Sequence, residues 1–397
     1  MLVGFMRNAK NPAIMARIIA IMCRYYDMEL IYIKPEDVDM DNQTVKGKMY
    51  IKNRWVNVEK ELPPIIDISA YCFKRKNRTI LNYLREHTFL TYDRKNALNK
   101  ERLQRELVKD KEFAHLVIPT AKAKTFEDVE NFLKKYTTIV MKPIHGEKGK
   151  GVYILKREGE DYILGYQKKE EKFNRAELET RYYSIVGQKK YIIQKYISSR
   201  TINGDPFDCR IHVQKDGKGK WSIAKKYIRI GIGQKVMSNV NQGGGISETK
   251  PFLQANFGEH WKEIEEKLNV LAKTLPYKME ELKNAPTMAL GLDVAIDKNG
   301  DLYLFETNGA PATGALLAQS ALLSTKYYQY VRKHKLPLGA KNTTNSYVKT
   351  KTEYEREIAE LKQENQKLKK EYQAIKESTS WRVTAPLRKV SQLLKKK

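Results

Sequence analysis

Short apolar runs separated by polar, turn-forming residues follow one another along most of the chain. The N-terminal run MLVGFM is typical of a buried strand, the apolar positions after Pro12 predict a helix, and ELIYIKP predicts a second strand. Apolar and polar residues then alternate on both sides of Asn53, which predicts a hairpin. These elements indicate an α/β subdomain, which we place at residues 1–115.

The pattern starts afresh near Ile118 and favours a second subdomain over residues 116–200. KTFEDVENFLKKY (124–136) has the spacing of an amphipathic helix. TIVMKPIHGEKGKGVYILKR (138–157) predicts a strand, a glycine-containing loop and a returning strand, and KYIIQKYIS (190–198) predicts a further strand.

A third subdomain is expected over residues 201–340. DCRIHVQKDGKGKWSIAKKYIRIG (208–231) predicts a hairpin of two long strands, and NQGGG (241–245) interrupts the pattern. A helix is predicted from His260 to Leu275, and a second hairpin follows it.

The composition changes beyond Lys341. Residues 341–352 are a polar linker, and apolar side chains then recur at alternating spacings of four and three over residues 353–377. This heptad predicts a short coiled coil that would form a homodimer, with Asn365 at a core position fixing its register or oligomeric state. A solvated single helix fits the same pattern.

Residues 378–397 combine apolar side chains, Trp381 and Leu387 among them, with six Lys or Arg residues. After Pro386 this pattern is typical of a basic amphipathic helix on an anionic membrane, where each cation contributes about 1 kcal/mol near the surface. It predicts peripheral binding at the inner face of the cytoplasmic membrane. A tail that packs on its own domain or is disordered fits equally well.

Charge and cysteine usage narrow the class of partner. The formal net charge of +27 favours polyanions such as nucleic acid, anionic lipid, phosphates or acidic polysaccharide. No helix-turn-helix pattern, RNP-like aromatic strand or zinc knuckle is present, so nucleic acid is not favoured.

Cys23, Cys72 and Cys209 are odd in number and lack CxxC spacing, which indicates neither a disulfide framework nor a zinc site. Without a signal-peptide pattern, we expect a cytoplasmic location.

Three oxygen-bearing side chains lie on the apolar second hairpin of the third subdomain. Asp293 begins the strand DVAI, DKNG forms the turn, and DLYLFETN returns with Glu306 and Asn308 on one face because they are two residues apart. Such ligands suit Mg²⁺, with Mn²⁺ as an alternative, because Mg²⁺ needs only one or two carboxylates beside nucleotide phosphates and water. Surface hairpins with nearby acids are also common, so the pattern alone leaves both interpretations open.

A second group of residues has the composition of a phosphate site. Lys142 follows a buried strand, and Gly146, Gly149 and Gly151 punctuate the loop after it. Glycines let backbone N–H groups approach phosphate oxygens closely, and a cation held by a strand neutralises them. No Lys-Ser or Lys-Thr pair ends the loop, so it is not a Walker A motif.

Together these segments resemble the ATP-grasp superfamily. IVMKP with its glycine-rich loop resembles the family's phosphate-covering flap, IIQKYI is similar to its adenine hinge, and DVAI to LYLFETNGAP resembles its metal-binding hairpin. The resemblance covers about residues 80–330. NKERLQREL and DCRIHVQKDGKGKW are similar to the YheC/YheD-like, endospore coat-associated branch. It implies an α/β (α+β) ATP-grasp fold with an N-terminal pre-ATP-grasp subdomain, here followed by a helical extension.

The resemblance also implies roles for individual residues. Phosphate contacts fall on Lys142, with Gly149 and Gly151 in the loop over them, and on Lys100, for which Lys95 competes. The remaining implied roles are an adenine pocket at Gln194, Lys195, Tyr196 and Ile197, a ribose contact at Asp208, γ-phosphate and acyl-phosphate contacts at Arg210 and Arg229, a reaction-centre amide at Asn241, and metal ligation by Asp293, Glu306 and Asn308.

Two positions depart from the family pattern. Gln194 stands where the family often has a glutamate, which adenine binding tolerates, and Gly291 stands where an arginine is sometimes found, which puts the acceptor substrate in doubt. The implied activity is that of an ATP-dependent carboxylate–amine ligase. The basic surface and tail further suggest that the carboxylate or the amine belongs to a cell-envelope or spore-surface polymer or its precursor. The alternative is a non-catalytic, coat-associated protein that keeps the fold.

Overall fold

The computed structural model describes residues 1–94, 96, 98, 100–144, 151–166, 169–186, 190–232, 244–336, 366 and 373. Contacts divide the chain into two units, Met1–Asn342 and Thr343–Lys397. Apart from two isolated residues, the predicted linker, coiled coil and tail lie outside the described residues, so they remain predictions, as does the division of the first unit at 115 and 200.

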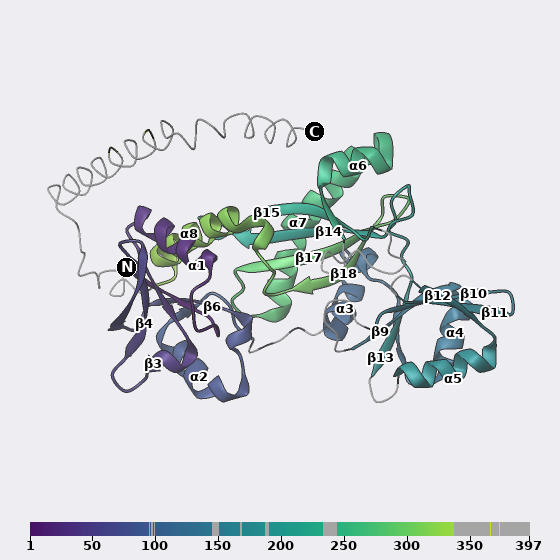
Figure 1. The fold of residues 1–397 in the computed structure, drawn as a ribbon, viewed down its shortest axis with the longest axis horizontal. Coiled ribbons are helices and arrows are strands. Elements are labelled where there is room, and N and C mark those ends of the chain that lie inside the picture. The colour runs from purple at the N-terminus through teal and green to yellow at the C-terminus, as the bar shows by residue number, and fades with distance from the viewer. Residues whose placement is uncertain are drawn as a thin grey trace. The chain divides into compact units, whose positions relative to one another are not determined.

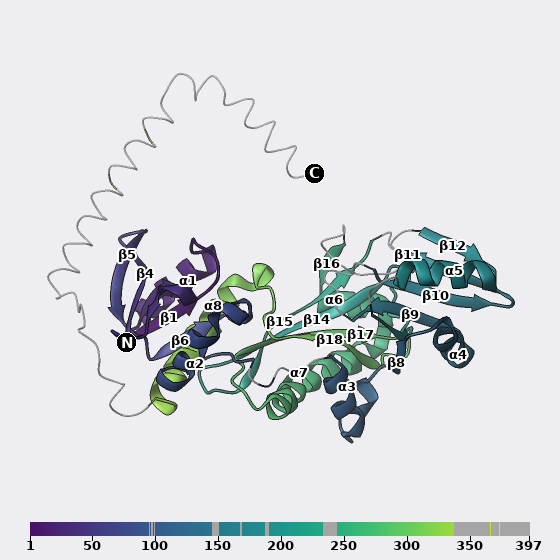
Figure 2. The same ribbon diagram turned by 90° about the horizontal axis from the view of Figure 1, so that it is seen from below.

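Three β-sheets form the first unit, as Figure 1 and Figure 2 show. The N-terminal sheet has the order β3-β4-β2-β1-β6-β7, with β5 paired to β4. The strands β2, β1, β6 and β7 run parallel, and β4 and β5 form the predicted hairpin around Asn53. Its elements are β1 (Leu2–Met6), α1 (Ile14–Tyr25), β2 (Glu29–Ile33), β3 (Val38–Asp39), β4 (Thr44–Ile51), β5 (Arg54–Glu61), β6 (Ile65–Ile68), α2 (Arg78–His87) and β7 (Phe89–Leu90).

The second sheet is antiparallel throughout, in the order β12-β11-β10-β9-β13-β8. Helices α4 and α5 bury one of its faces, and Phe126, Val129 and Leu133 of α4 pack there on Ile139 and Met141. Thr125 and Asp128 form a capping box that starts α4. The elements are α3 (Lys100–Lys109), β8 (Thr120–Ala123), α4 (Phe126–Tyr136), β9 (Thr138–Pro143), β10 (Tyr153–Glu158), β11 (Asp161–Tyr166), β12 (Lys169–Phe173), α5 (Arg175–Val186) and β13 (Tyr191–Lys195).

The third sheet, β16-β15-β14-β17-β18, is also antiparallel. Side chains of α6 and α7 bury one face of it, and the other face is polar. Its elements are β14 (Phe207–Lys215), β15 (Trp221–Ile230), β16 (Gly245–Glu248), α6 (Thr249–Phe257), α7 (Trp261–Lys283), β17 (Ala289–Ile296), β18 (Leu302–Asn308) and α8 (Leu317–His334).

Two predicted boundaries differ from the structure. The helix predicted to end at Leu275 continues to Lys283 through Pro276, because buried side chains on both sides of the proline keep it packed on the sheet. The strand predicted to begin at Asp293 begins at Ala289, because Leu290 and Leu292 belong to the same buried core.

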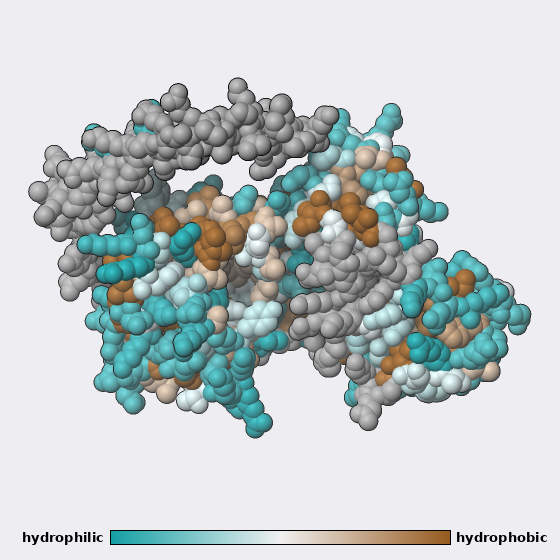
Figure 3. Space-filling model, viewed as in Figure 1, coloured by the Kyte–Doolittle hydropathy of each residue, from teal (hydrophilic) through white to brown (hydrophobic). Residues whose placement is uncertain are grey.

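Helix α8 links the first and third sheets through buried contacts. The Tyr328 hydroxyl donates to Asp67 on β6, and Gln214 on β14 donates to Ser324 Oγ at 2.7 Å. Hydrophilic residues predominate on the side of the described surface seen in Figure 3, with apolar residues confined to smaller patches. Within the described parts of the chain, every helix is too short or too polar to traverse a lipid bilayer.

We predict that Gly47→Ala lowers the free energy of unfolding by about 1–3 kcal/mol, because an added Cβ overpacks the N-terminal sheet. That atom would lie 2.6 Å from the Tyr32 carbonyl oxygen. The matched control is Gly165→Ala in β11, where the nearest atom would be 3.6 Å away and the change is expected to stay within about 0.5 kcal/mol. Urea unfolding of both variants is the measurement, and equal effects would contradict the packing argument.

Candidate functional site

The polar face of the third sheet carries most of the candidate site. Along β14, Cys209, Ile211 and Val213 point into the core, so the alternate residues Asp208, Arg210, His212 and Gln214 share the opposite face. Alternation with period two thus places a carboxylate, a guanidinium group, an imidazole and an amide on one face of a single strand.

The three proposed metal ligands come together on this face. Across the β17–β18 hairpin Asp293 pairs with Glu306 and Gly291 pairs with Asn308, so the three side chains lie on neighbouring positions. Gly300 holds the turn with φ of +78°, and the Asp297 carboxylate accepts the backbone N–H groups of Asn299 and Asp301. The turn fixes the pairing from Ile296 with Leu302 to Val294 with Leu304, and a β-bulge at Phe305 then shifts the register so that Glu306 lies opposite Asp293.

Asp293 is held by two arginines from neighbouring strands. Arg210 lies directly opposite it on β14, donates from Nη2 to Oδ2 at 3.0 Å, and brings Nε into ion-pair contact with Oδ1. The Nε and Oδ1 atoms are not aligned as a hydrogen bond, so charge alone pairs them. Arg229 Nη2 reaches the same Oδ2 at 3.1 Å.

Arg229 also binds Asp208, its neighbour across β14 and β15. Arg229 Nε donates to Asp208 Oδ1 at 2.7 Å, and Nη2 donates to Oδ2. Burial raises the pKa of Asp208 against the opposing effect of Arg229. Burial acts to lower the pKa of Arg229, but the two carboxylates outweigh it and raise that pKa. Two acids and two arginines thus form one compensated, mostly buried network.

Gly291 leaves the space that Arg210 uses. A Cβ at this position would lie 3.0 Å from Arg210 Nη1 and 3.0 Å from Pro311 Cβ. A larger residue at position 291 would therefore press on both Arg210 and Pro311.

The donor set suits Mg²⁺ better than zinc. Among the residues that the structure describes, no three His, Cys, Asp or Glu side chains are grouped to hold a metal. Two carboxylates and one amide are hard oxygen ligands, the kind that Mg²⁺ uses together with substrate phosphates. Asp293, Glu306 and Asn308 are therefore donors of the kind that Mg²⁺ uses, but both Asp293 oxygens are paired with arginines, so one of these pairs would have to open for Asp293 to bind the ion.

The second sheet presents Lys142 and Gln194 on the face that α4 and α5 leave uncovered. Lys142 Nζ donates to Gln194 Oε1 at 2.7 Å, and Gln194 Nε2 donates to Thr120 Oγ1 at 2.9 Å. The buried amide thereby fixes the direction of the lysine. Gly151, at the end of the loop after Lys142, has φ of +75°, which favours glycine there.

The predicted adenine hinge, at residues 194–197, offers the Lys195 carbonyl as a hydrogen-bond acceptor because its neighbour in the sheet is Pro119. Lys195 donates its N–H to the Pro119 carbonyl at 2.9 Å, and in an antiparallel pair the opposite residue would donate back. Pro119 has no N–H, so the Lys195 carbonyl lacks this ladder donor. The Tyr196 N–H is engaged by Thr138, and Ile197 packs with Ile118 and Ala295. A carbonyl beside an apolar cluster can accept a hydrogen bond from a base edge.

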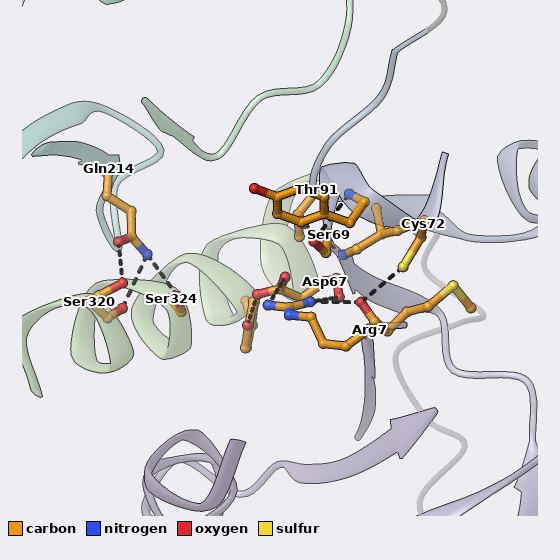
Figure 4. A network of polar contacts seen from close by, with 12 residues as sticks. Arg7, Asp67, Ser69, Cys72, Thr91, Gln214, Ser320 and Ser324 are labelled. Atoms are coloured by element: carbon orange, nitrogen blue, oxygen red, sulfur yellow. Dashed lines mark hydrogen bonds and ion pairs between the residues drawn. The ribbon is translucent and has the colours of Figure 1, made fainter. Parts of the chain in front are cut away.

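A cavity of about 570 Å³ adjoins the site, and sequence reasoning missed it. Its wall includes Arg7 and Asp67 from the N-terminal sheet, His212 from β14 and the segment 309–313 that follows Asn308. Figure 4 shows Arg7 beside Asp67, and Gln214 directed at Ser320 and Ser324. A polar residue at every second position of β14 is the signal that indicates this face, whereas nothing local pairs Arg7 with Asp67.

Comparison with known proteins decides the family. The family described as YheC/D like ATP-grasp matches residues 90–336, more than half of the chain. The chain belongs to this family. In Bacillus subtilis (strain 168), the endospore coat-associated protein YheC is 23% identical over 313 residues, which cover 74% of this chain and 84% of YheC. Its counterpart YheD is 22% identical over 284 residues, which cover 69% of this chain but only 62% of YheD.

Similarity to solved structures is weaker. The D-cycloserine synthetase DcsG has a TM-score of 0.48 and 16% identity, over 82% of this chain and 100% of that protein. The family assignment does not depend on this likeness. With the family match, the mixed α/β architecture of the first unit is an ATP-grasp fold.

Some residues of the predicted ATP-grasp site lie outside the described residues. Gly149, Asn241 and Lys95 are among them, and Lys100 is described only as the first residue of α3. The structure brings together Arg210, Arg229, Asp208 and the three predicted metal ligands on the third sheet, and Lys142 with Gln194 on the second.

We predict that Arg229→Met lowers the free energy of unfolding by about 3–5 kcal/mol, because it strands the buried Asp208 carboxylate. The double variant Arg229→Met, Asp208→Leu should recover most of this loss, because the unpaired Asp208 carboxylate is then removed as well. Lys172→Met is the control, since Lys172 pairs with Asp161 on the surface and such pairs contribute about 0–1 kcal/mol. Urea unfolding compares the three variants, and a single change no costlier than the control would show that the network is not effectively buried.

Proposed function

We propose that this protein is an ATP-dependent carboxylate–amine ligase that works through an acyl phosphate. The observation that carries the proposal is the placement of Asp293, Glu306 and Asn308 on one sheet face beside Arg210 and Arg229. The family match supports an ATP-grasp ligase in general, and the roles of individual residues are our proposal.

The reaction would proceed in two displacements. A carboxylate oxygen of one substrate bonds to the γ-phosphorus of ATP, the bond from that phosphorus to the β–γ bridging oxygen breaks, and ADP leaves. The amine nitrogen then bonds to the acyl carbon, the carbon–oxygen bond to the phosphate breaks, and the nitrogen loses a proton as phosphate departs.

The residues of the chain contribute position and charge. Arg210 and Arg229 carry guanidinium groups whose paired donors match phosphate oxygens, and their partners Asp293 and Asp208 keep them oriented. When bound, Mg²⁺ supplies positive charge that offsets the phosphate oxygens. Since both Asp208 oxygens are engaged by Arg229, we assign Asp208 to orient that arginine; the ribose contact implied by the resemblance would require the pair to open.

The second sheet would hold the rest of the nucleotide. We assign Lys142 to the phosphates, because Gln194 fixes its direction, and the Lys195 carbonyl to the adenine amino group, because Pro119 cannot donate to it. The Ile197 side chain, which already packs on Ala295, would lie against the base.

We predict that a non-hydrolysable ATP analogue binds in the presence of Mg²⁺ and that Lys142→Ala weakens binding about tenfold or more, because a charged hydrogen bond to phosphate is lost. The double change Glu306→Ala, Asn308→Ala should weaken binding with Mg²⁺ but have little effect when EDTA is present. The measurement is calorimetric titration.

Lys134→Ala is the matched control for this titration. Lys134 is an exposed lysine on α4, which covers the opposite face of the second sheet, so nucleotide affinity should not change. If correctly folded wild-type protein does not bind the analogue, the ligase proposal is wrong.

A second candidate is a non-catalytic protein associated with a coat. The description of YheC and YheD as endospore coat-associated proteins favours it. The presence of an oxygen donor at all three proposed metal positions supports the ligase instead. ADP release that depends on a carboxylate and an amine would decide between the two candidates.

We also propose that one substrate is attached to a cell-envelope or spore-surface polymer, or to its precursor, and that residues 378–397 bind anionic membrane. The net charge of +27 and the basic, apolar composition of this segment support contact with a polyanionic surface. Protein lacking residues 378–397 should then no longer sediment with phosphatidylglycerol vesicles at low salt. Unchanged sedimentation would refute the membrane contact.

A further inference from the structure

The cavity beside the candidate site is large enough for a small molecule and is nearly neutral. Its volume of about 570 Å³ lies in the range of ligand pockets. Arg7 and Asp67 are the charged side chains among the described residues that line it, and they pair with each other at 3.0 Å. Asp67 also accepts the Tyr328 hydroxyl. A ligand with several charges would therefore find no unpaired opposite charge on this wall.

His212 is the polar group on this wall whose hydrogen bonding is incomplete. The side chain is 1% exposed, and its Nε2 atom has no hydrogen-bonding partner among the described residues. Its neighbour on the same strand face, Gln214, is by contrast fully engaged, donating to Ser324 and to the Ser320 carbonyl and accepting from the Ser320 hydroxyl. A buried nitrogen without a partner is costly unless something binds to it.

The strand pairing places His212 next to the proposed reaction centre. His212 lies opposite Gly291 on β17, and Gly291 lies opposite Asn308 on β18, so the three residues form one row across the sheet. Neighbouring strands are about 4.8 Å apart, so the backbones of His212 and Asn308 are about 10 Å apart. Pro311 packs over Gly291, and like His212 it lines the cavity. A molecule in the cavity would therefore lie within reach of an acyl phosphate held near Asn308.

The chemistry of His212 makes it a hydrogen-bond acceptor. Burial, with the nearby Arg210 charge, lowers the pKa of His212 to about 4, although Gln214 acts to raise it, so the ring is neutral at pH 7. A neutral imidazole has one N–H and one bare nitrogen. The unpartnered Nε2 is a hydrogen-bond acceptor in the tautomer that leaves this nitrogen bare.

We propose that this cavity holds the amine substrate of the ligase and that an N–H of the amine donates to His212 Nε2. The inference rests on the proposed function and names the class of substrate, a compact primary amine that carries at most one further charge. His212 acts by orientation: it turns the nitrogen lone pair toward the acyl carbon, and the proton that the nitrogen loses leaves with phosphate.

The test observes the histidine ring directly in full-length protein. With ¹⁵N-labelled histidine, the resonance of His212 is assigned by its absence in His212→Phe, which keeps an aromatic ring but no acceptor. The probes are hydroxylamine and glycinamide, which carry amine N–H groups, and acetate, which carries none. We expect the amine probes to shift the Nε2 resonance and acetate to leave it unchanged.

Saturation-transfer titration of glycinamide provides the affinity. His212→Phe should weaken its binding about tenfold, which corresponds to one lost hydrogen bond of about 1.4 kcal/mol. Tyr32→Phe is the matched control, since it removes a hydroxyl from the same cavity wall that already donates to the Ala9 carbonyl, and it should change affinity less than about twofold.

Each outcome has a distinct meaning. A His212 resonance that responds to acetate, or to none of the probes, would overturn the assignment of the amine to this cavity. Nucleotide binding by His212→Phe at the wild-type level would show that this failure leaves the ligase proposal intact. If glycinamide shifts His212 but the wild type binds no ATP analogue, the ligase proposal fails and the cavity remains an amine site without that reaction.

Discussion

The shared carboxylate of Asp293 is the interaction on which the candidate site depends. It meets Arg210 from the adjacent strand and Arg229 from the strand beyond, and Arg229 in turn holds Asp208. Two buried carboxylates compensate two guanidinium groups, so removal of any one of these four side chains would leave an uncompensated charge in the low-dielectric interior. Because side chains alternate with period two, a slip of one residue would turn these charges into the core and is strongly disfavoured. The charges therefore help to fix the register of β14, β15 and β17, and the separate β17–β18 pairing places Glu306 opposite Asp293.

The local part of this arrangement could be predicted from the sequence. Glu306 and Asn308 share a face because they are two residues apart. The DKNG turn alone, however, would place Phe305 opposite Asp293, and the β-bulge that brings Glu306 there was not predicted. The pairing of Arg210 with Asp293 could not be predicted in this way, because the two residues are 83 positions apart and only the formation of the β14–β17 pair brings them together. Pro276 shows the opposite limit: a proline usually ends a helix, but burial of its neighbours on the third sheet keeps α7 continuous.

The cavity could not be predicted for a related reason. Its wall joins a strand near the N-terminus, the C-terminal half of β14 and the first half of α8, which long-range contacts bring together. Tyr328 reaches Asp67 across 261 residues, and Gln214 reaches Ser324 across 110. Such buried polar contacts stabilise the fold only when every partner is satisfied, and so they fix the position of α8 closely. The imidazole of His212 stands out against this satisfied background.

The distribution of charge separates the site from the basic surface. The network around Asp293 pairs its arginines with acids, and the cavity pairs Arg7 with Asp67, so neither accounts for a net charge of +27. The excess of lysine and arginine must lie elsewhere on the chain, where it can attract a polyanion with a strength that falls as the salt concentration rises. A small, weakly charged group inside the cavity and a large anionic body outside it are compatible requirements. Both are met when the proposed amine substrate is compact and the proposed polymer-linked substrate is the carboxylate.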